Sequence, residues 1–260
     1  MKNARHFLAT AEVERFHRDG FLIPAFRFSE ADVTILSRDV SRIVDLHPDK
    51  RNEPIVTAHL PNRDRQGQEF SLMPFCRREE VLDMIQSIDG PDLMLWTTTV
   101  FARPARDGIA TPWHQDGEFW PIEPMAGTSA WVAATPSTRA NGCVRVVPGS
   151  HLRPRRHRLV TGSMFILQVD PSEFDEADAV DVELEAGQMM LFDSRLIHGS
   201  WPNTSDTPRE GFVMRYIPTT SFFDHERPSP NGGPPAYADR ALFLVRGTDR
   251  CGRNDFVRNH

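Results

Sequence analysis

The sequence lacks the features that mark a secreted or membrane-spanning chain. Its three cysteines (Cys76, Cys143 and Cys251) are widely spaced with no CxxC pair, so neither a disulfide framework nor a cysteine zinc site is indicated. The N-terminus has early acidic residues and no continuous apolar run, unlike a secretory signal. No stretch approaches the length of a membrane span. We therefore expect a cytoplasmic protein with no membrane partner.

A concentrated positive charge is also missing. The net charge is −6 and the basic residues are dispersed, which argues against nucleic acid as a partner. The composition, 39% hydrophobic and 25% charged, is ordinary for a globular protein with a sizeable core. A length of 260 residues fits one domain. We expect a helical part over 1–91, a β core over 92–220 and an extension over 221–260, and the oligomeric state (monomer or homodimer) stays open.

The N-terminal part is predicted to be helical. One apolar pattern runs up to a break at Gly20 and continues just after it: Phe7, Val13, Phe16, Phe21 and Leu22. A second helix is expected after Ser29, because Ser29 followed by Asp32 resembles a capping box. Its apolar face would contain Val33, Leu36, Val40, Ile43 and Val44. Pro48 should end it, since proline disfavours helix in the residue before it. A short helix is expected at about 77–88.

Residues 48–75 are polar and show little periodicity. Such a segment is long for a structureless loop in a compact domain, so we expect it to be functional or mobile. A mobile lid over a substrate site is one such role.

From residue 92 the chain changes to short β-rich runs between turn residues. The strand candidates are Leu93–Phe101, Thr128–Thr135, Cys143–Pro148, Phe165–Val169, Val180–Leu184, Gln188–Phe192 and Phe212–Ile217. Many short strands at this spacing favour a β-sandwich or barrel, with the preceding helices packed on one face. We predict a mainly β fold with flanking helices, and a tail that wraps the surface.

One segment places an imidazole and a carboxylate two residues apart, at His114 and Asp116. In an extended chain these residues face the same side, about 7 Å apart at the backbone, so both can reach one metal ion. A second imidazole, His198, follows another β-rich run. Two histidines and one carboxylate leave three metal positions open, the arrangement of Fe(II) oxygenases. An HxD pair alone is a weak signal.

The residues that flank His114, Asp116 and His198 strengthen this metal-site signal. Two stretches resemble the phytanoyl-CoA dioxygenase family: WHQDGEFWPIEPMAGTSAWVAATPSTRANGCVRVVPGSH over 113–151, and AGQMMLFDSRLIHGSWPNTSDTPREGFVMRYI over 186–217. The opening VERFHRDGFLI is also similar. The resemblance implies a double-stranded β-helix, a jelly-roll barrel. It further implies Fe(II) held by His114, Asp116 and His198, with 2-oxoglutarate and O2 as co-substrates.

Arg209, eleven residues after His198, matches the family arginine that binds the distal carboxylate of 2-oxoglutarate, and a guanidinium suits that task. Ser200 and Trp131 match positions that help hold the co-substrate, although a turn serine and a core aromatic are the simpler interpretations. Arg215 is the alternative to Arg209 for binding 2-oxoglutarate. Along one strand they would lie roughly 20 Å apart, so we expect Arg215 to form a structural ion pair elsewhere on the barrel.

The resemblance implies hydroxylation of an unactivated C–H, with release of succinate and CO2 and no side-chain acid or base. Because Asp116 is present, chlorination is disfavoured, while desaturation and ring chemistry stay open. The string HQDG.FWPI.P resembles relatives that hydroxylate aminoalkyl-phosphonates. No Lys/Arg tract marks a CoA site, so we expect a small polar or zwitterionic metabolite. The pocket candidates are Glu118, Phe119, Trp120, Trp201 and Asn203.

Other interpretations stay open. A carboxylate beside aromatics, as at Glu118, could receive a cationic amine, or Glu118 could simply be solvated beside core aromatics. The enzyme could instead be a biosynthetic tailoring oxygenase with a larger substrate, which a wide apolar cavity would favour. A non-catalytic barrel with structural zinc would need a fourth ligand. The nearest candidates, His151 and His157, are expected at the surface.

Overall fold

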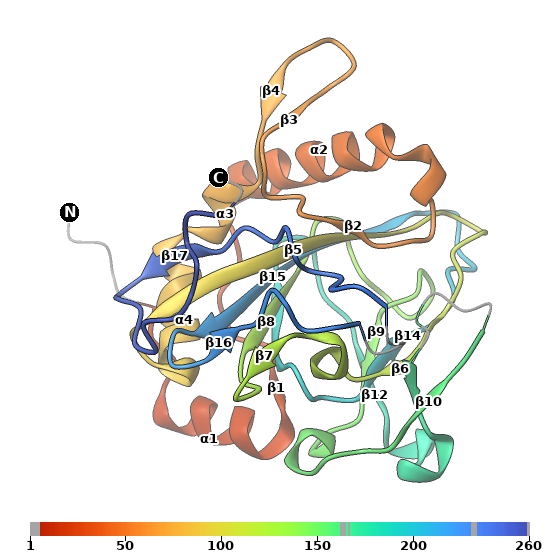
Figure 1. Ribbon diagram of the computed structural model, residues 1–260. Coiled ribbons are helices and arrows are strands. Elements are labelled where there is room, and N and C mark those ends of the chain that lie inside the picture. The colour runs from red at the N-terminus through yellow and green to blue at the C-terminus, as the bar shows by residue number, and fades with distance from the viewer. Residues whose placement is uncertain (1–5, 162–164, 166, 230–232, 259–260) are drawn as a thin grey trace.

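Two antiparallel sheets form the body of the protein, described here from a computed structural model for residues 6–161, 165, 167–229 and 233–258 (Figure 1). The larger, seven-stranded sheet has the order β1-β13-β8-β15-β5-β17, with β2 also paired to β5. Its strands are β1 (Phe21–Leu22), β2 (Ile55–Val56), β5 (Leu93–Arg103), β8 (Thr128–Ala133), β13 (Met189–Asp193), β15 (Arg209–Pro218) and β17 (Phe243–Arg246). The smaller sheet has the order β12-β9-β14-β6. Its strands are β6 (Thr111–His114), β9 (Val144–Val146), β12 (Val180–Val182) and β14 (His198–Ser200). The predicted mainly β, jelly-roll fold is confirmed.

The long strand β15 separates two environments. Its residues Phe212, Met214 and Tyr216 join the core that the helices cover. The alternate residues Arg209 and Arg215 face a cavity on the other side of the sheet. This two-residue alternation is the ordinary geometry of a strand with both faces covered. It directs charged side chains inward at the site.

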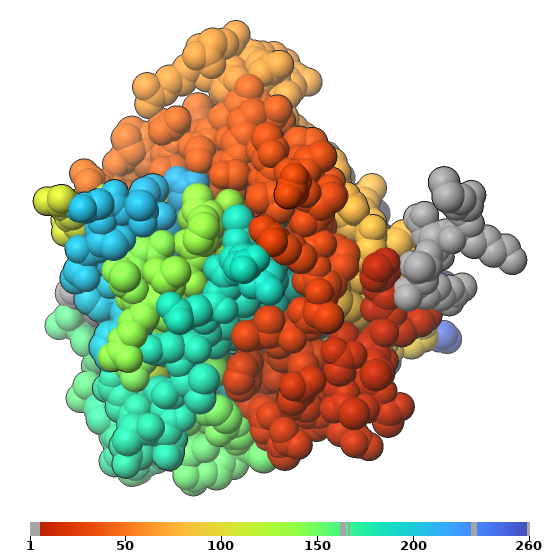
Figure 2. All heavy atoms as spheres, turned by 180° about the vertical axis from the view of Figure 1, so that it is seen from behind, coloured from red at the N-terminus to blue at the C-terminus, as the bar shows by residue number. Residues whose placement is uncertain are grey.

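Helices cover the outer face of the larger sheet, as the sequence predicts. They are α1 (Thr10–Asp19), α2 (Glu30–Leu46), α3 (Met73–Cys76) and α4 (Glu79–Asp89). The α2 and α4 helices pack on β5, β8 or β15. Seen from behind, the N-terminal part (red to orange) forms much of the right-hand side of the visible surface (Figure 2). Ser29 caps α2 and accepts a hydrogen bond from the Asp32 N–H. The expected helical continuation at Phe21 is wrong: Gly20 ends α1 with φ 82°, and Phe21–Leu22 pairs with β13 instead.

The segment 48–75 has more structure than its composition indicates. It contains a 3-10 helix (Pro48–Lys50), β2 on the larger sheet, and the hairpin of β3 (Asn62–Arg63) and β4 (Glu69–Phe70), which projects from the body (Figure 1). Pairing of Ile55–Val56 with β5 fixes the middle of the segment. The segment is therefore not a structureless loop, and its role as a mobile lid stays a prediction.

The C-terminal part is also built into the fold rather than only wrapped around it. The strand β16 (Phe222–Phe223) pairs with β7 (Ile122–Glu123), and β17 extends the larger sheet. A further pair, β10 (His157–Leu159) and β11 (Leu167–Val169), forms a separate ribbon. The strand expected over 165–169 matches β11 in part, and residue 166 lies outside the described residues. Among the residues described, no helix is long and apolar enough to cross a membrane.

Candidate metal centre and adjoining cavities

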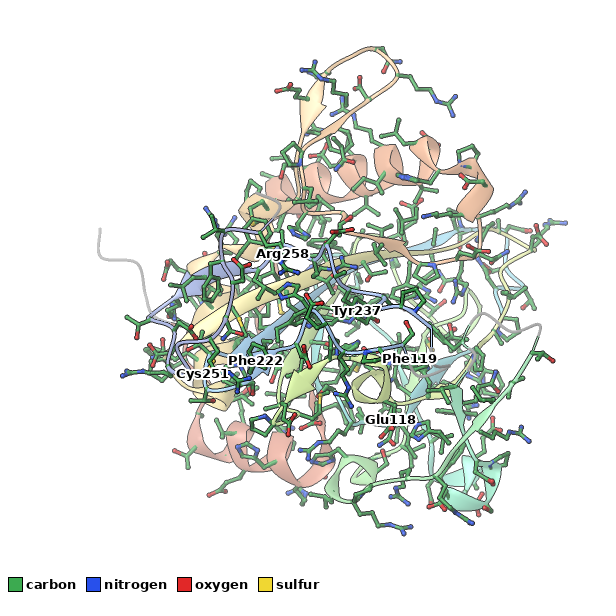
Figure 3. The ribbon with its side chains drawn as sticks, viewed as in Figure 1. Glu118, Phe119, Phe222, Tyr237, Cys251 and Arg258 are labelled. Carbon is green, nitrogen blue, oxygen red and sulfur yellow. The ribbon has the colours of Figure 1, made fainter. Side chains whose placement is uncertain are left out.

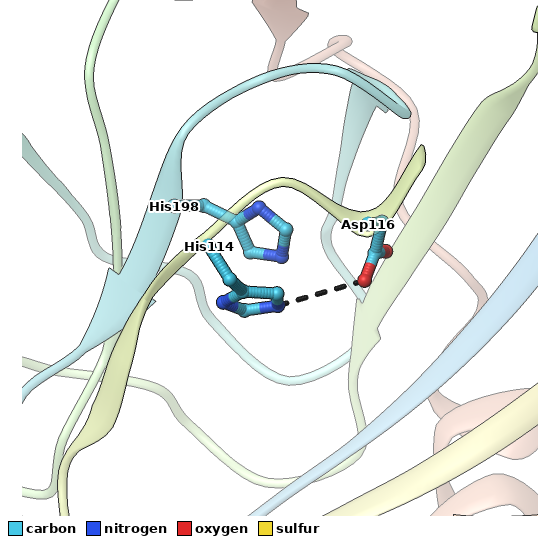
Figure 4. A group of neighbouring side chains, drawn as sticks. All are labelled: His114, Asp116 and His198. Atoms are coloured by element: carbon cyan, nitrogen blue, oxygen red, sulfur yellow. Dashed lines mark ion pairs between the residues drawn. The ribbon is translucent and has the colours of Figure 1, made fainter. Parts of the chain in front are cut away.

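The structure brings His114, Asp116 and His198 together (Figure 4). His114 is the last residue of β6, Asp116 begins the 3-10 helix η2 (Asp116–Phe119), and His198 begins β14. Antiparallel pairing of β14 with β6 sets His198 directly opposite His114. One ligand atom from each residue lies within 4.8 Å of the other two. The three side chains, all at most 9% exposed, can therefore hold one metal ion.

Backbone contacts fix the tautomer of both imidazoles. His114 Nδ1 lies 2.9 Å from the Pro112 carbonyl oxygen, and His198 Nδ1 lies 3.0 Å from that of Leu196. A carbonyl can only accept a hydrogen bond, so each Nδ1 carries a proton, and Nε2 is the ring nitrogen left to face a metal ion. Burial, and then the charge of His114, lower the pKa of His198 to about 4. A neutral imidazole is the form that binds a metal.

Arg215 contacts Asp116, the third residue of the candidate ligand group. Its Nε and Nη2 both donate to Asp116 Oδ2 at 3.3 Å, while Oδ1 lies 3.5 Å from His114 Nε2. Burial opposes ionisation of Asp116, but its interactions, with the charge of Arg215 foremost, outweigh burial and hold the pKa of Asp116 below the ordinary value. The expectation that Arg215 pairs elsewhere on the barrel is wrong. Register along β15 places it at the centre, and sequence spacing gave no sign of its partner.

A narrow cavity leads from the two histidines to a pair of buried arginines. Arg103 and Arg209 are opposite each other in the β5–β15 pairing, and both line this cavity with His114 and His198. Burial, and then the charge of Arg103, lower the pKa of Arg209 to about 9. Within the described chain, Arg209 Nε has no hydrogen-bond partner and no carboxylate pairs with its guanidinium. An unpaired buried guanidinium fits an anionic ligand.

Ser200 and Trp131 line the same cavity. The Arg209 guanidinium lies 5.4 Å from the Trp131 ring centroid. Ser200 Oγ donates to Thr111 Oγ1 at 2.9 Å, and Thr111 accepts a hydrogen bond from Arg103. Arg103 was missed by sequence reasoning. Its place at the end of the long strand β5 is a sequence signal for a role, but only the register of the β5–β15 pairing sets Arg103 opposite Arg209.

Gly211 lets the Trp131 ring take this position. It lies between Arg209 and Val213 on β15, and a Cβ at this residue would overlap the indole ring. The close approach of ring and backbone requires glycine for space alone. The indole therefore forms a rigid wall beside Arg209.

A second cavity, of about 290 Å³, opens on the other side of Asp116. Among the predicted pocket residues, Phe119 and Trp120 line it. Asp116 and Arg215 line it as well, and residues that the sequence did not single out contribute the rest: Pro54, Val56, Trp96, Thr97, Thr99, Phe101, Phe165, Tyr237 and Arg240. Trp96 and Trp120 contact edge to face, with ring centroids 4.8 Å apart. The segment 48–75 and the C-terminal part thus both reach the site.

Three predicted pocket residues lie outside this cavity. Glu118 lines neighbouring clefts and has a carboxylate oxygen 3.9 Å from His157 Nδ1. Trp201 donates to Asp181 and stacks under the Arg145 guanidinium at 3.8 Å. Asn203 is buried and donates to backbone carbonyls, among them that of Arg103 at 3.0 Å.

His151 is not at the surface as expected. It is buried, and its Nε2 lies 3.0 Å from the His17 carbonyl oxygen. The side chain of His157 is only 6% exposed. Neither residue joins the ligand group, which among the residues described contains three members. A closed four-ligand zinc shell is not formed by these side chains.

Comparison with known proteins agrees with this geometry. The family described as phytanoyl-CoA dioxygenase (PhyH) matches residues 5–211. A phytanoyl-CoA dioxygenase of Arabidopsis thaliana is 32% identical over 119 residues, 45% of this chain and 42% of that protein, so the match spans less than half of its length. An ectoine dioxygenase of Bordetella parapertussis is 26% identical over 93% of this chain and 86% of that protein. The non-heme monooxygenase ThoJ, in its apo structure, superposes with a TM-score of 0.70 at 30% identity, over 91% of this chain and 84% of ThoJ. The chain belongs to the phytanoyl-CoA dioxygenase family.

Proposed function

We propose that this protein is a dioxygenase that uses Fe(II) and 2-oxoglutarate to hydroxylate an unactivated C–H of a small polar or zwitterionic metabolite. One observation carries the proposal: a cavity joins the two histidines of the ligand group to the unpaired, buried guanidinium of Arg209. Such a cavity suits a small dianion that reaches from a metal to an arginine. An amino-acid-like or aminoalkyl-phosphonate-like compound fits the class of substrate.

Each residue has a distinct role in this proposal. His114 and His198 offer neutral Nε2 atoms to iron, and Asp116 offers Oδ1 while Arg215 holds Oδ2. Arg209 binds the distal carboxylate of 2-oxoglutarate, beside Trp131 and Ser200. With 2-oxoglutarate, iron supplies the oxidising chemistry: the co-substrate yields succinate and CO2, and one atom of O2 enters the substrate. The buried walls exclude water, and no side chain has to move a proton.

The size of the second cavity supports a small substrate. Its volume of about 290 Å³ is just below the range of typical ligand pockets, roughly 300–1,000 Å³. The similarity to an ectoine dioxygenase over 93% of the chain points the same way, because that enzyme is named for a small molecule. A fatty acyl-CoA or a large polycyclic substrate would need a longer channel.

Succinate formation tests the activity. Protein loaded anaerobically with Fe(II) should convert 2-oxoglutarate to succinate when O2 is admitted, slowly alone and faster with a substrate from a panel of amino acids, betaines and aminoalkyl-phosphonates. His114→Ala should lose both iron and succinate formation. His17→Ala, an exposed histidine of α1, is the matched control and should behave as wild type. No turnover by wild type, together with full iron content in His114→Ala, would refute the proposal.

A further inference from the structure

Arg240 brings an unpaired positive charge into the second cavity. Its Nη1 donates to Thr97 Oγ1 at 2.9 Å, and in the described part of the chain no ion pair joins it to a carboxylate. The other charged residues that line the cavity are Asp116 and Arg215, and these pair with each other. Arg240 is therefore the uncompensated side-chain charge of this cavity.

The aromatic walls do not form a free cage for a cation. The Arg240 guanidinium lies 6.0 Å from the Trp96 centroid and 5.6 Å from the Tyr237 centroid. The Arg215 guanidinium lies 5.6 Å from the centroid of Trp120. These rings already interact with the protein's own cations, and a substrate ammonium would have to approach two guanidinium groups. The charge and the ring contacts both favour an anion.

The chain holds Arg240 firmly in this position. His225 Nε2 donates to the Arg240 carbonyl at 2.8 Å, and the Arg240 N–H donates to the Tyr237 carbonyl at 3.0 Å. Arg258 Nη1 donates to the Ala238 carbonyl at 2.8 Å. Figure 3 shows Tyr237 on the C-terminal segment, near Phe119 of η2, and both line the cavity. The guanidinium is thus supported by a segment tied down at both ends.

This segment lies outside the part of the chain that the family match covers. The match ends at residue 211, whereas Tyr237 and Arg240 come after it. The metal ligands and Arg209 lie within the match. The C-terminal segment thus contributes a charged residue to the cavity from outside the matched region.

We propose that Arg240 binds a carboxylate of the substrate and so selects a carboxylate-bearing compound over an amine or a neutral analogue. This rests on the proposed function, because it assigns one end of the substrate of that same site. One guanidinium with one hydrogen bond already made to Thr97 matches a singly charged carboxylate. This narrows the substrate class of the proposed function to its carboxylate-bearing members, because the second negative charge of a phosphonate dianion would be left unpaired in a half-buried site.

Ligand binding without turnover tests the assignment. The protein would be loaded with Ni(II) and saturating 2-oxoglutarate, which fills the Arg209 site first. Pentanoate, pentanamide, pentylamine and butylphosphonate would then be titrated by calorimetry. Pentanoate should bind wild type at least tenfold more tightly than the other three. Arg240→Met should weaken pentanoate about tenfold or more, and Arg240→Lys should recover part of the loss.

Two controls keep the outcomes distinct. Arg253→Met removes an exposed arginine of the same C-terminal part, which stacks on Phe222 outside the cavity, and should change pentanoate binding less than twofold. If Arg240→Met does not fold, Arg240→Gln takes its place, and it should weaken pentanoate binding because it also removes the charge. Tighter binding of the amine or phosphonate, or unchanged pentanoate binding in a folded Arg240→Met, overturns the assignment. Succinate formation by wild type is scored separately, so its absence counts against the proposed function and not against the binding pattern.

Discussion

Replacing Arg215 with methionine tests how Asp116 is kept ionised in a buried site. The guanidinium contacts Oδ2 through two hydrogen bonds of 3.3 Å. At an effective dielectric of roughly 20, two unit charges at that distance attract by about 5 kcal/mol, which is a ceiling of roughly three to four pKa units. Without Arg215, burial raises the pKa of Asp116. A proton then competes with the metal, so we expect a loss of about 10- to 100-fold in Fe(II) affinity at pH 7.

The expected loss of Fe(II) affinity in Arg215→Met also depends on pH in a definite direction. In the variant the loss should grow as pH falls from 8 to 6, because protonated Asp116 cannot bind the metal, whereas wild type should vary less over that range. Affinity would be measured anaerobically by competition with a chelator, with circular dichroism to show that the variant is folded. Arg209→Met, which contacts no metal ligand, is the matched control. Unchanged or tighter iron binding would mean that repulsion between the guanidinium and Fe(II) outweighs its support of Asp116, and would refute the reasoning.

Three other substitutions probe the surroundings of the site. Arg209→Lys should raise the KM for 2-oxoglutarate at least tenfold and leave iron binding unchanged, because lysine loses the bidentate fork; an equal rise in Arg240→Lys would argue against this role. Gly211→Ala should displace the Trp131 ring, with a cost of roughly 1–3 kcal/mol in unfolding free energy and weaker 2-oxoglutarate binding; calorimetry that detects neither would contradict the packing argument. Burial, and then Arg240, lower the pKa of His59 to about 4, so the stability due to its neutral form is lost as pH falls from about 6.5 to 4. His59→Gln should reduce the pH slope of unfolding free energy there, by up to about 3 kcal/mol in total, and an unchanged slope would exclude this source.

The sequence predicted the mainly β fold, and it named three candidate metal ligands that the structure places side by side. Periodicity and the Ser29 cap predicted α2, and the HxD spacing with the distant histidine named a set that the structure brings together. Both are local sequence patterns, so they can be interpreted without knowing which strands pair. The jelly roll came from resemblance, since short strands alone favour several β architectures.

What the sequence did not reveal depends on register. Arg103 faces Arg209, and Arg215 reaches Asp116, because of how β5 and β15 align and how η2 turns after β6. Nearness in sequence also led to a wrong prediction for one pocket residue. Glu118 follows Asp116 by only two residues, but the turn of the 3-10 helix directs it to other clefts.

The position of β6 has a consequence for the integrity of the two sheets. It is the edge strand of the smaller sheet, and it carries His114, while Asp116 just after it is tied to β15 of the larger sheet through Arg215. An ion held by His114, Asp116 and His198 would therefore cross-link an edge strand to its neighbour and, through one ion pair, to the opposite sheet. Edge strands are where a sheet opens most readily. Metal loading would then stabilise the pairing of β6 with the rest of the fold and slow amide exchange along β6. It would do so in addition to preparing the site for chemistry.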